Sequence, residues 1–173
     1  LPVIDTRGDV VAFGSRVLDK SEPKYMNSSE TPVYSKRRVL YGLNLAKKSK
    51  RPNIILCEGN LDIVTLHQAG FDNAVASMGT ALTVEQTRLL SRFTKELVLC
   101  YDNDNAGKIA TERALQILNG SEFSVKVLQL PRRLVDGEYI KQDADDFIKL
   151  QGPDAFERLL NGCLLYTSDA ADE

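Results

Sequence analysis

The sequence predicts an α/β fold in which a parallel β-sheet is flanked by helices. Two observations lead to this class. From residue 53 onward, short apolar runs alternate with longer segments that have the 3.6-residue apolar spacing of helices. Two of these longer segments end at a glycine, where helices commonly stop. Chains that alternate strands and helices in this way form parallel sheets with right-handed crossovers.

The expected elements follow in order along the chain. Before residue 53, glycines and prolines interrupt short apolar stretches, which favours short strands joined by loops. After it, apolar runs predict strands at residues 53–57, 73–77, 96–101 and 124–130. Amphipathic spacing predicts helices at residues 60–69, around Leu89, Leu90 and Phe93, at 106–118, at 143–150 and at 154–160.

Charge is divided unevenly between two parts of the chain. Residues 1–52 carry 11 Lys and Arg against 5 Asp and Glu, whereas residues 53–173 carry 11 against 19, within a total of -2. A basic segment beside an acidic one predicts that the first binds a polyanion and the second binds cations. An ordinary solvated surface is the alternative interpretation.

The composition excludes several other classes of protein, including membrane-spanning and disulfide-rich ones. The chain is 43% hydrophobic and 27% charged, as globular proteins are, and it has no apolar run of the roughly 18 to 20 residues that a membrane span needs. Cys57, Cys100 and Cys163 are widely spaced, which suits neither a disulfide framework nor a zinc site, so a cytoplasmic protein is expected. Leu1 in place of Met indicates that the true start is missing.

Acidic residues follow two predicted strands at the point where each strand ends. Glu58 follows the first strand of the sheet, and Asp102 and Asp104 follow the third. Because the carboxyl ends of parallel strands meet at one edge, we expect these side chains to converge. Uncompensated carboxylates would raise one another's pKa values, so a bound cation is predicted. Ligands that are all oxygen suit Mg²⁺ or Mn²⁺.

Asp102 and Asp104 have three other interpretations. An EF-hand loop starting at Asp102 needs Asp or Asn at its fifth position and Glu at its twelfth, where the chain has Ala106 and Arg113. A phosphatase of the haloacid dehalogenase type also uses Asp-x-Asp, but its usual Gly-Thr or Gly-Val is absent and Glu58 would have no role. Capping of the following helix remains open beside metal binding.

The order of these motifs resembles a known family. Glu58-Gly59-x-x-Asp62, then Ser77-Met78-Gly79-Thr80, then Asp102-x-Asp104-x-Ala106-Gly107 is similar to the Toprim domain, the metal-binding unit of bacterial primases, topoisomerases and some nucleases. The stretches FGSRVL, PKYMNSSET and LYGL, which begin at Phe13, Pro23 and Leu40, resemble the basic half of the bacterial replicative primase core (DnaG type). Asp143-Ala144-Asp145 takes the place of that family's Asp-Pro-Asp motif.

The resemblance covers residues 1 to about 162 and implies a division of the chain. Residues 1–52 would be the C-terminal part of a basic α+β subdomain, 53–135 the Toprim domain, and 136–162 the Asp-x-Asp segment with the start of a helical subdomain. The tail at 163–173 departs from the family pattern and is expected to be a truncated or chimeric end. A preceding zinc-binding module and a following helicase-binding domain are expected in the full-length protein, so this part alone should prime poorly.

The implied activity is that of a DNA primase, which makes short RNA primers on single-stranded DNA from NTPs. In this reaction a 3′-hydroxyl attacks the α-phosphate of an NTP and pyrophosphate leaves, with metal ions neutralising the developing charge. A Toprim nuclease or topoisomerase is one alternative, although a topoisomerase would need a nucleophilic tyrosine in a separate domain. A non-catalytic nucleic-acid-binding module is the other.

The resemblance also implies roles for individual residues. The implied metal ligands are Asp102, Asp104, Asp143 and Asp145, with Glu58 either a ligand or a general base. The implied contacts to template, primer or NTP are Arg16, Lys24, Tyr25, Asn27, Lys36 and Arg37. Supporting residues around the metal are Gly59, Asp62, Gly79 and Thr80. His67 is expected to be structural, and Cys57 and Cys100 are expected to be buried thiols.

Overall fold

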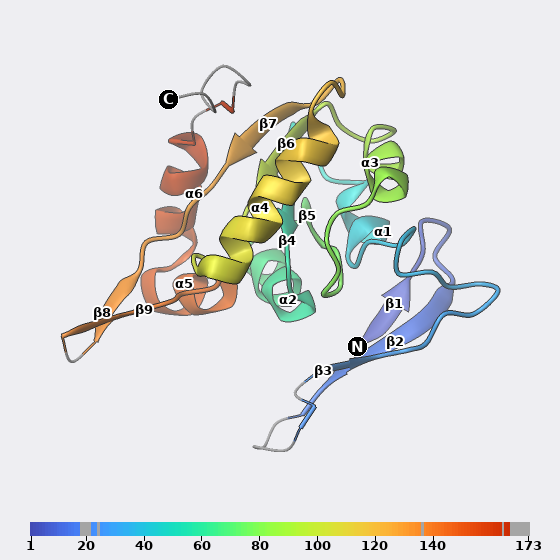
Figure 1. The fold of residues 1–173 in the computed structure, drawn as a ribbon, viewed down its shortest axis with the longest axis horizontal. Helices are drawn as coiled ribbons and strands as arrows, with labels where there is room; N and C mark the ends of the chain where they lie inside the picture. The colour runs from blue at the N-terminus through green and yellow to red at the C-terminus, as the bar shows by residue number, and fades with distance from the viewer. Residues whose placement is uncertain (18–21, 24, 136, 164, 167–173) are drawn as a thin grey trace.

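The computed structural model describes residues 1–17, 22–23, 25–135, 137–163 and 165–166. Its strands are β1 Pro2–Ile4, β2 Val10–Arg16, β3 Tyr25–Asn27, β4 Asn53–Cys57, β5 Ala74–Ala76, β6 Glu96–Leu99, β7 Ser124–Val127, β8 Arg133–Val135 and β9 Glu138–Ile140. Its helices are α1 Leu43–Ala46, α2 Asn60–Gln68, α3 Val84–Leu90, α4 Asn105–Leu118, α5 Ala144–Gln151 and α6 Pro153–Asn161. Figure 1 shows a central sheet between helices, with smaller β-structures on either side.

The central sheet confirms the predicted α/β class. Its strands run in the order β5-β4-β6-β7, and each neighbouring pair is parallel. All four predicted strands are present, although β7 ends at Val127 and not at residue 130. The carboxyl ends of β4, β5 and β6 therefore lie at one edge, as the sequence predicts.

Alternate residues of β4 pack into two different apolar cores, one on each face of the central sheet. Ile55 and Cys57 belong to a core that includes apolar residues of α2, α5 and α6. Ile54 and Leu56 belong to a second core, with apolar residues of α1, α3 and α4. Because successive side chains of a strand point to opposite faces, a run without polar residues is what a sheet buried on both sides requires. Cys57 and Cys100 are both buried free thiols, as predicted.

The N-terminal segment forms a separate antiparallel sheet in the order β1-β2-β3. Two groups of contacts join it to the central sheet. The backbone of Tyr41 pairs with Ala76 at the edge of β5, and Asn27 Nδ2 donates a hydrogen bond to the carbonyl of Met78 over 3.3 Å. Met78 is buried with Val3 and Tyr34 in a small core between the two sheets. Helix α1 was not predicted.

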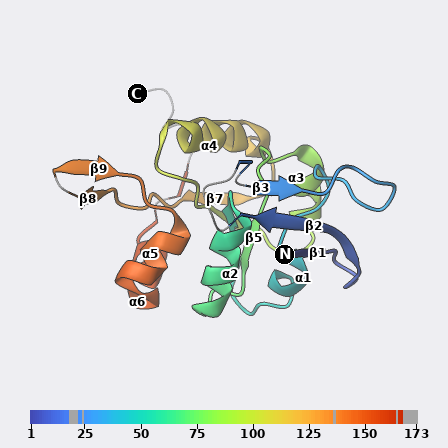
Figure 2. The same ribbon diagram turned by 90° about the horizontal axis from the view of Figure 1, so that it is seen from below.

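Residues 133–140 differ most from the sequence-based expectation. They form the hairpin of β8 and β9, which projects from the body on the opposite side from the N-terminal sheet (Figures 1 and 2). Strands of three residues are shorter than the runs that strand prediction detects, so this hairpin was missed. The expected domain boundary after residue 135 falls within the hairpin. Farther along, Tyr166 donates its backbone N–H to Val125 over 2.8 Å beside β7.

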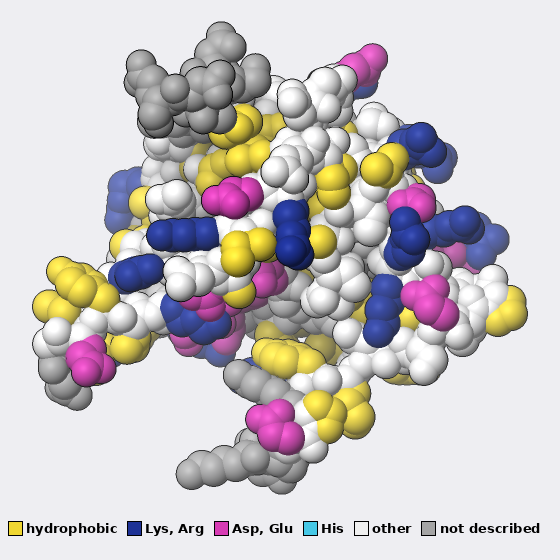
Figure 3. Space-filling view, viewed as in Figure 1, with side chains coloured by type: hydrophobic (Ala, Val, Ile, Leu, Met, Phe, Trp, Pro, Cys, Tyr) yellow, Lys and Arg dark blue, Asp and Glu magenta, His cyan; other side chains and the backbone are white. Residues whose placement is uncertain are grey.

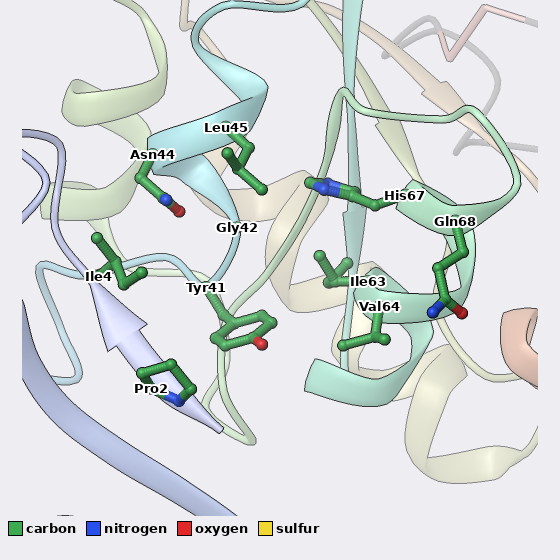
Figure 4. A pocket seen from close by; sticks show the side chains of 10 residues that line it. All are labelled: Pro2, Ile4, Tyr41, Gly42, Asn44, Leu45, Ile63, Val64, His67 and Gln68. Carbon is green, nitrogen blue, oxygen red and sulfur yellow. The ribbon is translucent and has the colours of Figure 1, made fainter.

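A mostly apolar cavity of about 300 Å³ lies between β1 and α2 (Figure 4). Tyr41 lies near its centre, between Ile4 of β1 and Ile63 of α2. His67 lines one side, and its Nε2 lies 2.8 Å from the carbonyl oxygen of Ala74. This contact gives His67 the structural role that was expected. Among the described residues, no helix is both long and apolar enough to cross a membrane.

Candidate active site

Asp102 and Asp104 lie in the turn that joins β6 to α4. Asp104 is the N-cap of α4, and its Oδ1 accepts a hydrogen bond from the backbone N–H of Gly107 over 2.8 Å. This bond lowers the pKa of Asp104 more than any other contact does. Asp102 donates its backbone N–H to Glu58 Oε1 over 3.2 Å. The predicted meeting of these strand ends is confirmed, and capping, which the sequence leaves open for both aspartates, is found for Asp104.

Gly107 allows the start of α4 to approach Asp102 closely. A Cβ at this position would lie 1.9 Å from the carbonyl oxygen of Asp102, a distance that no side chain tolerates. Gly107 is buried in the first turn of the helix. The steric argument explains the glycine that follows Asp-x-Asp in the sequence. Without a side chain, it lets two backbone segments approach each other closely.

Lys141 was not predicted as a site residue, yet it bridges the two aspartates. Its Nζ lies 3.1 Å from Asp102 Oδ2 and 3.2 Å from Asp104 Oδ2. Hydrogen bonds to Asp102 and Asp104 raise the pKa of Lys141 above its ordinary value. Lys141 matches none of the sequence motifs, so no sequence signal would have found it. Its ammonium group shows that the two carboxylates can share a cation.

Asp62 is a buried carboxylate that joins two helix starts. Its Oδ2 accepts the backbone N–H of Gly59, and its Oδ1 accepts the backbone N–H of Asp145, each over 3.2 Å. Burial raises the pKa of Asp62 to about 7, and the neighbouring charge of Asp143 adds to the shift. Asp62 therefore ties the start of α2 to the start of α5.

A second group of carboxylates lies at the start of α5. One carboxylate oxygen from each of Asp143, Asp145 and Asp146 lies within 4.8 Å of the other two. Asp143 is the N-cap of α5 and accepts the backbone N–H of Asp146 over 2.8 Å. Asp145 accepts hydrogen bonds from Thr65 Oγ1 and, over 2.6 Å, from Lys149 Nζ. Sequence analysis missed Asp146, although it is adjacent to the predicted pair.

One cavity of about 300 Å³ connects the two carboxylate groups. Eight of the predicted site residues line it: Tyr25, Asn27, Glu58, Gly59, Asp62, Gly79, Asp102 and Asp143. Asn60, Met78 and Lys141 line it as well. Burial, and then the charge of Asp102, raises the pKa of Glu58. Asn60 Oδ1 is buried without a hydrogen-bond partner among the described residues. The cavity thus offers several oxygen ligands and an unsatisfied amide oxygen.

The other predicted residues lie at the margin of this cavity or away from it. The guanidinium of Arg16 lies 5.5 Å from the centre of the Tyr25 ring. Thr80 donates its hydroxyl to the carbonyl of Ser77 over 2.8 Å. Arg37 pairs with Glu85 of α3 over 3.5 Å.

Lys36 also lies against α3. Its carbonyl accepts a hydrogen bond from Gln86 Nε2 over 2.9 Å, and its backbone N–H donates to Glu30 Oε1 over 2.8 Å. Neither Lys36 nor Arg37 is among the residues that line the carboxylate cavity. Lys24 lies outside the described residues.

Comparison with known proteins agrees with this geometry. Residues 55–148 match the Toprim-like family, and residues 1–47 match the N-terminal domain of the DNA primase catalytic core. The DNA primase of Clostridium acetobutylicum is 44% identical over 164 residues, which is 94% of this chain and 26% of that protein. The chain thus spans about a quarter of the length of the curated relatives it matches.

The solved structures that the chain resembles are also those of primases. The zinc-binding and RNA polymerase domains of the Aquifex aeolicus primase match with a TM-score of 0.84 and 39% identity over 96% of this chain and 40% of that one. A DnaG primase catalytic domain bound to single-stranded DNA matches with a TM-score of 0.83 and 36% identity, covering 95% of this chain and 51% of that one.

The parallel sheet and the acidic edge that it presents define a Toprim-like protein. The similarity extends beyond the Toprim-like part of the chain. Residues 1–47 match the N-terminal domain of the primase core, and the identity to the Clostridium acetobutylicum primase covers 94% of the chain. The chain belongs to the bacterial DNA primase family of the DnaG type.

Proposed function

We propose that this chain is part of the catalytic core of a DNA primase, a nucleotidyltransferase that makes RNA primers on single-stranded DNA. One observation carries the proposal. The cavity that joins Glu58 and Asp102 to Asp143 is walled on another side by Tyr25 and Asn27 of β3, in the N-terminal sheet. Carboxylates for cations and an aromatic side chain for a base therefore meet in one place.

The donor set of the cavity fits Mg²⁺ or Mn²⁺. Asp102 and Asp104 already share one cation, the ammonium group of Lys141. Asp143 and Asp145 would hold a second ion at the start of α5, where their oxygens lie within 4.8 Å of each other. When bound, such ions would neutralise charge on the triphosphate and favour ionisation of the primer 3′-hydroxyl.

The residues of the chain would contribute position and proton transfer. Glu58 suits a general base because its raised pKa brings its proton affinity closer to neutral pH, although a role as a metal ligand remains compatible with its place. Gly59, Asp62, Gly79 and Thr80 would hold the loops around the carboxylates. Asp62 would do so through its two backbone hydrogen bonds, which fix the start of α5 against the start of α2.

The basic N-terminal segment, residues 1–52, would guide the strand and the NTP. Arg16 and Tyr25 are adjacent and exposed, so a base can stack on the ring while the guanidinium contacts a phosphate. Lys24 and Lys36 are proposed phosphate contacts from their motif positions, and Arg37 would have to leave Glu85 to act as one. NTPs, the RNA primer and a replicative helicase at the bacterial replication fork are the proposed partners, the helicase through a further domain of the protein.

Primer synthesis by defined variants tests this proposal. The chain is incubated with single-stranded DNA, labelled NTPs and Mg²⁺ or Mn²⁺, and compared with Asp102→Asn and Glu58→Gln. Glu112→Gln, an exposed carboxylate on α4, is the matched control. Short RNA products that are lost in the first two variants and kept in the control support the proposal. Cleavage of the DNA would favour a Toprim nuclease, and products that persist in both variants would contradict the assigned site.

If the yield of primers is too low to measure, calorimetric titration with Mn²⁺ still tests the metal site. Binding is expected for the unsubstituted chain and the Glu112→Gln control, with weaker binding for Asp102→Asn. Equal binding in all three would show that the carboxylate edge does not hold the ion.

A further inference from the structure

The β8–β9 hairpin exposes a pair of large side chains that nothing in the described part of the chain covers. Leu134 and Tyr139 are direct partners across the two strands, and they are 59% and 71% exposed. Neither belongs to any of the three apolar cores. Large apolar side chains that lie together on an exposed surface can mark a binding site.

Two cationic side chains continue this surface toward the carboxylates. Arg132 and Lys141 flank the two strands at the base of the hairpin, each two positions from Leu134 or Tyr139 in the sequence. Their contacts agree with this placement. Arg132 Nε donates to the carbonyl of Asn103 over 3.3 Å, and Lys141 pairs with Asp102 and Asp104.

The opposite face of the hairpin has a different character. There Arg133 pairs with Ile140, and Val135 pairs with Glu138, the acidic residue nearest the turn in β9. The cationic end of the hairpin thus lies at the carboxylate site, and its apolar pair lies farther out. Figure 3 shows hydrophobic side chains on the projecting hairpin and Lys or Arg side chains where it joins the body.

We propose that this surface, formed by Leu134, Tyr139, Arg132 and Lys141, binds a single nucleic-acid strand beside the metal centre. Tyr139 stacks on a base, and Arg132 contacts a phosphate. An aromatic platform beside cations is the arrangement that binds single strands without reading their sequence. The inference rests on the proposed primase function, and it adds a second contact on the hairpin, which lies on the opposite side of the molecule from the N-terminal sheet (Figure 2).

A protein partner is the competing occupant, because exposed Leu134 also suits an apolar interface. The line of cations leading from the hairpin to Asp102 and Asp104 favours the nucleic acid. A polyanion is attracted by cations beside the carboxylate site, whereas an apolar protein interface gains little from charges at its core.

Binding of a fluorescent single-stranded oligothymidylate, measured by anisotropy, tests the inference. The variants are Tyr139→Ala and Tyr139→Phe, with Tyr166→Ala beside β7 as the matched tyrosine control. We expect Tyr139→Ala to weaken binding about tenfold, while Tyr139→Phe and Tyr166→Ala stay within about twofold of the unsubstituted chain, because phenylalanine keeps the stacking face. Circular dichroism checks that each variant is folded.

Salt dependence gives an independent measurement. For Arg132→Gln, the slope of log binding constant against log salt concentration should become shallower by about 0.7, the value for one phosphate contact in a single strand. Unchanged binding in Tyr139→Ala, or equal losses in Tyr139→Phe and Tyr139→Ala, would overturn the inference. So would a change in self-association, seen by sedimentation, that occurs without a change in DNA binding.

Failure of this inference is distinguishable from failure of the proposed function. The anisotropy measurement needs no primer synthesis and is made both in Mn²⁺ and in EDTA. If the unsubstituted chain makes primers and Tyr139→Ala binds DNA normally, only the hairpin surface is wrong. If no primers form and Mn²⁺ binding does not depend on Asp102, the function is wrong whatever the hairpin binds.

Discussion

Lys141 and Asp102, separated by 39 positions in the chain, form an ion pair with an Nζ–Oδ2 distance of 3.1 Å. The same ammonium group contacts Asp104, so it lies where a divalent cation shared by the two aspartates would bind. A metal ion held by the two aspartates, as proposed, would therefore compete with the lysine for the same carboxylate oxygens. Such binding would have to displace Lys141 or move it aside.

Replacing Lys141 should therefore strengthen metal binding. Partly exposed ion pairs contribute about 0.2–1 kcal/mol each, so we expect Lys141→Met to bind Mn²⁺ about two- to fivefold more tightly in calorimetric titration. Lys95→Met is the control, because Lys95 pairs with Glu122 at the other end of the sheet. Weaker Mn²⁺ binding in Lys141→Met would mean that the lysine supports the site and does not compete with the ion.

Asp104 is the N-cap of α4 and a proposed metal ligand, and different substitutions separate the two roles. Asn is as good an N-cap as Asp but lacks the charge, whereas Ala removes both. We expect Asp104→Asn to keep the free energy of unfolding within about 0.5 kcal/mol, and Asp104→Ala to lower it by about 1 kcal/mol. Urea unfolding measures the effect on capping, and Mn²⁺ titration measures the effect on metal binding.

Both Asp104 variants should bind Mn²⁺ more weakly than the unsubstituted chain. Normal Mn²⁺ binding by Asp104→Asn would assign the aspartate to capping alone. A loss of stability in Asp104→Asn as large as that in Asp104→Ala would show instead that the charge, and not the cap, stabilises the start of α4.

Gly107 should tolerate no side chain. A Cβ would lie 1.9 Å from the carbonyl oxygen of Asp102, so the backbone of Asp102 or the start of α4 has to shift. We expect Gly107→Ala to lower the free energy of unfolding by about 1–3 kcal/mol, as overpacked sites do, and to weaken Mn²⁺ binding. The control is Gly162→Ala after α6, where the nearest atom to an added Cβ would be 3.4 Å away. Equal stability of the two variants would contradict the steric argument.

Glu96 should make stability depend on pH. Its Oε1 accepts hydrogen bonds from Lys126 Nζ over 3.0 Å and from Asn53 Nδ2 over 3.2 Å, and the contact with Lys126 is the largest cause that lowers its pKa. A carboxyl group whose pKa is lower in the folded state stabilises the fold above its unfolded pKa of about 4.3. This contribution is lost as the pH falls through the folded pKa.

Glu96→Gln should therefore unfold more easily at pH 7, by about 0.5–1 kcal/mol. The difference from the unsubstituted chain should shrink as the pH falls below about 4. Urea unfolding at a series of pH values measures it, and Glu112→Gln on α4 should show no such difference. A difference that stays constant down to pH 3 would rule out the ion pair as its source.

Local sequence patterns were enough to predict the central sheet. Apolar runs such as residues 53–57 become strands because they are buried on both faces, and the motifs at Glu58 and Asp102 come directly after such runs. The N-cap at Asp104 is also local, because the cap and the N–H that it accepts are three residues apart. The convergence of Glu58 and Asp102 follows once the strands are known to be parallel.

Tertiary structure alone decided the contacts that complete the site. Lys141 reaches Asp102 and Asp104 across 39 and 37 positions, and Asp62 accepts a backbone hydrogen bond from Asp145 across 83. No periodicity or motif relates such distant positions. The sequence by itself determined the sheet and the acidic residues at its carboxyl edge, because burial and capping act over a few neighbouring residues. Only the position of Lys141 after the hairpin and the packing of α5 against α2 decided which charges meet there.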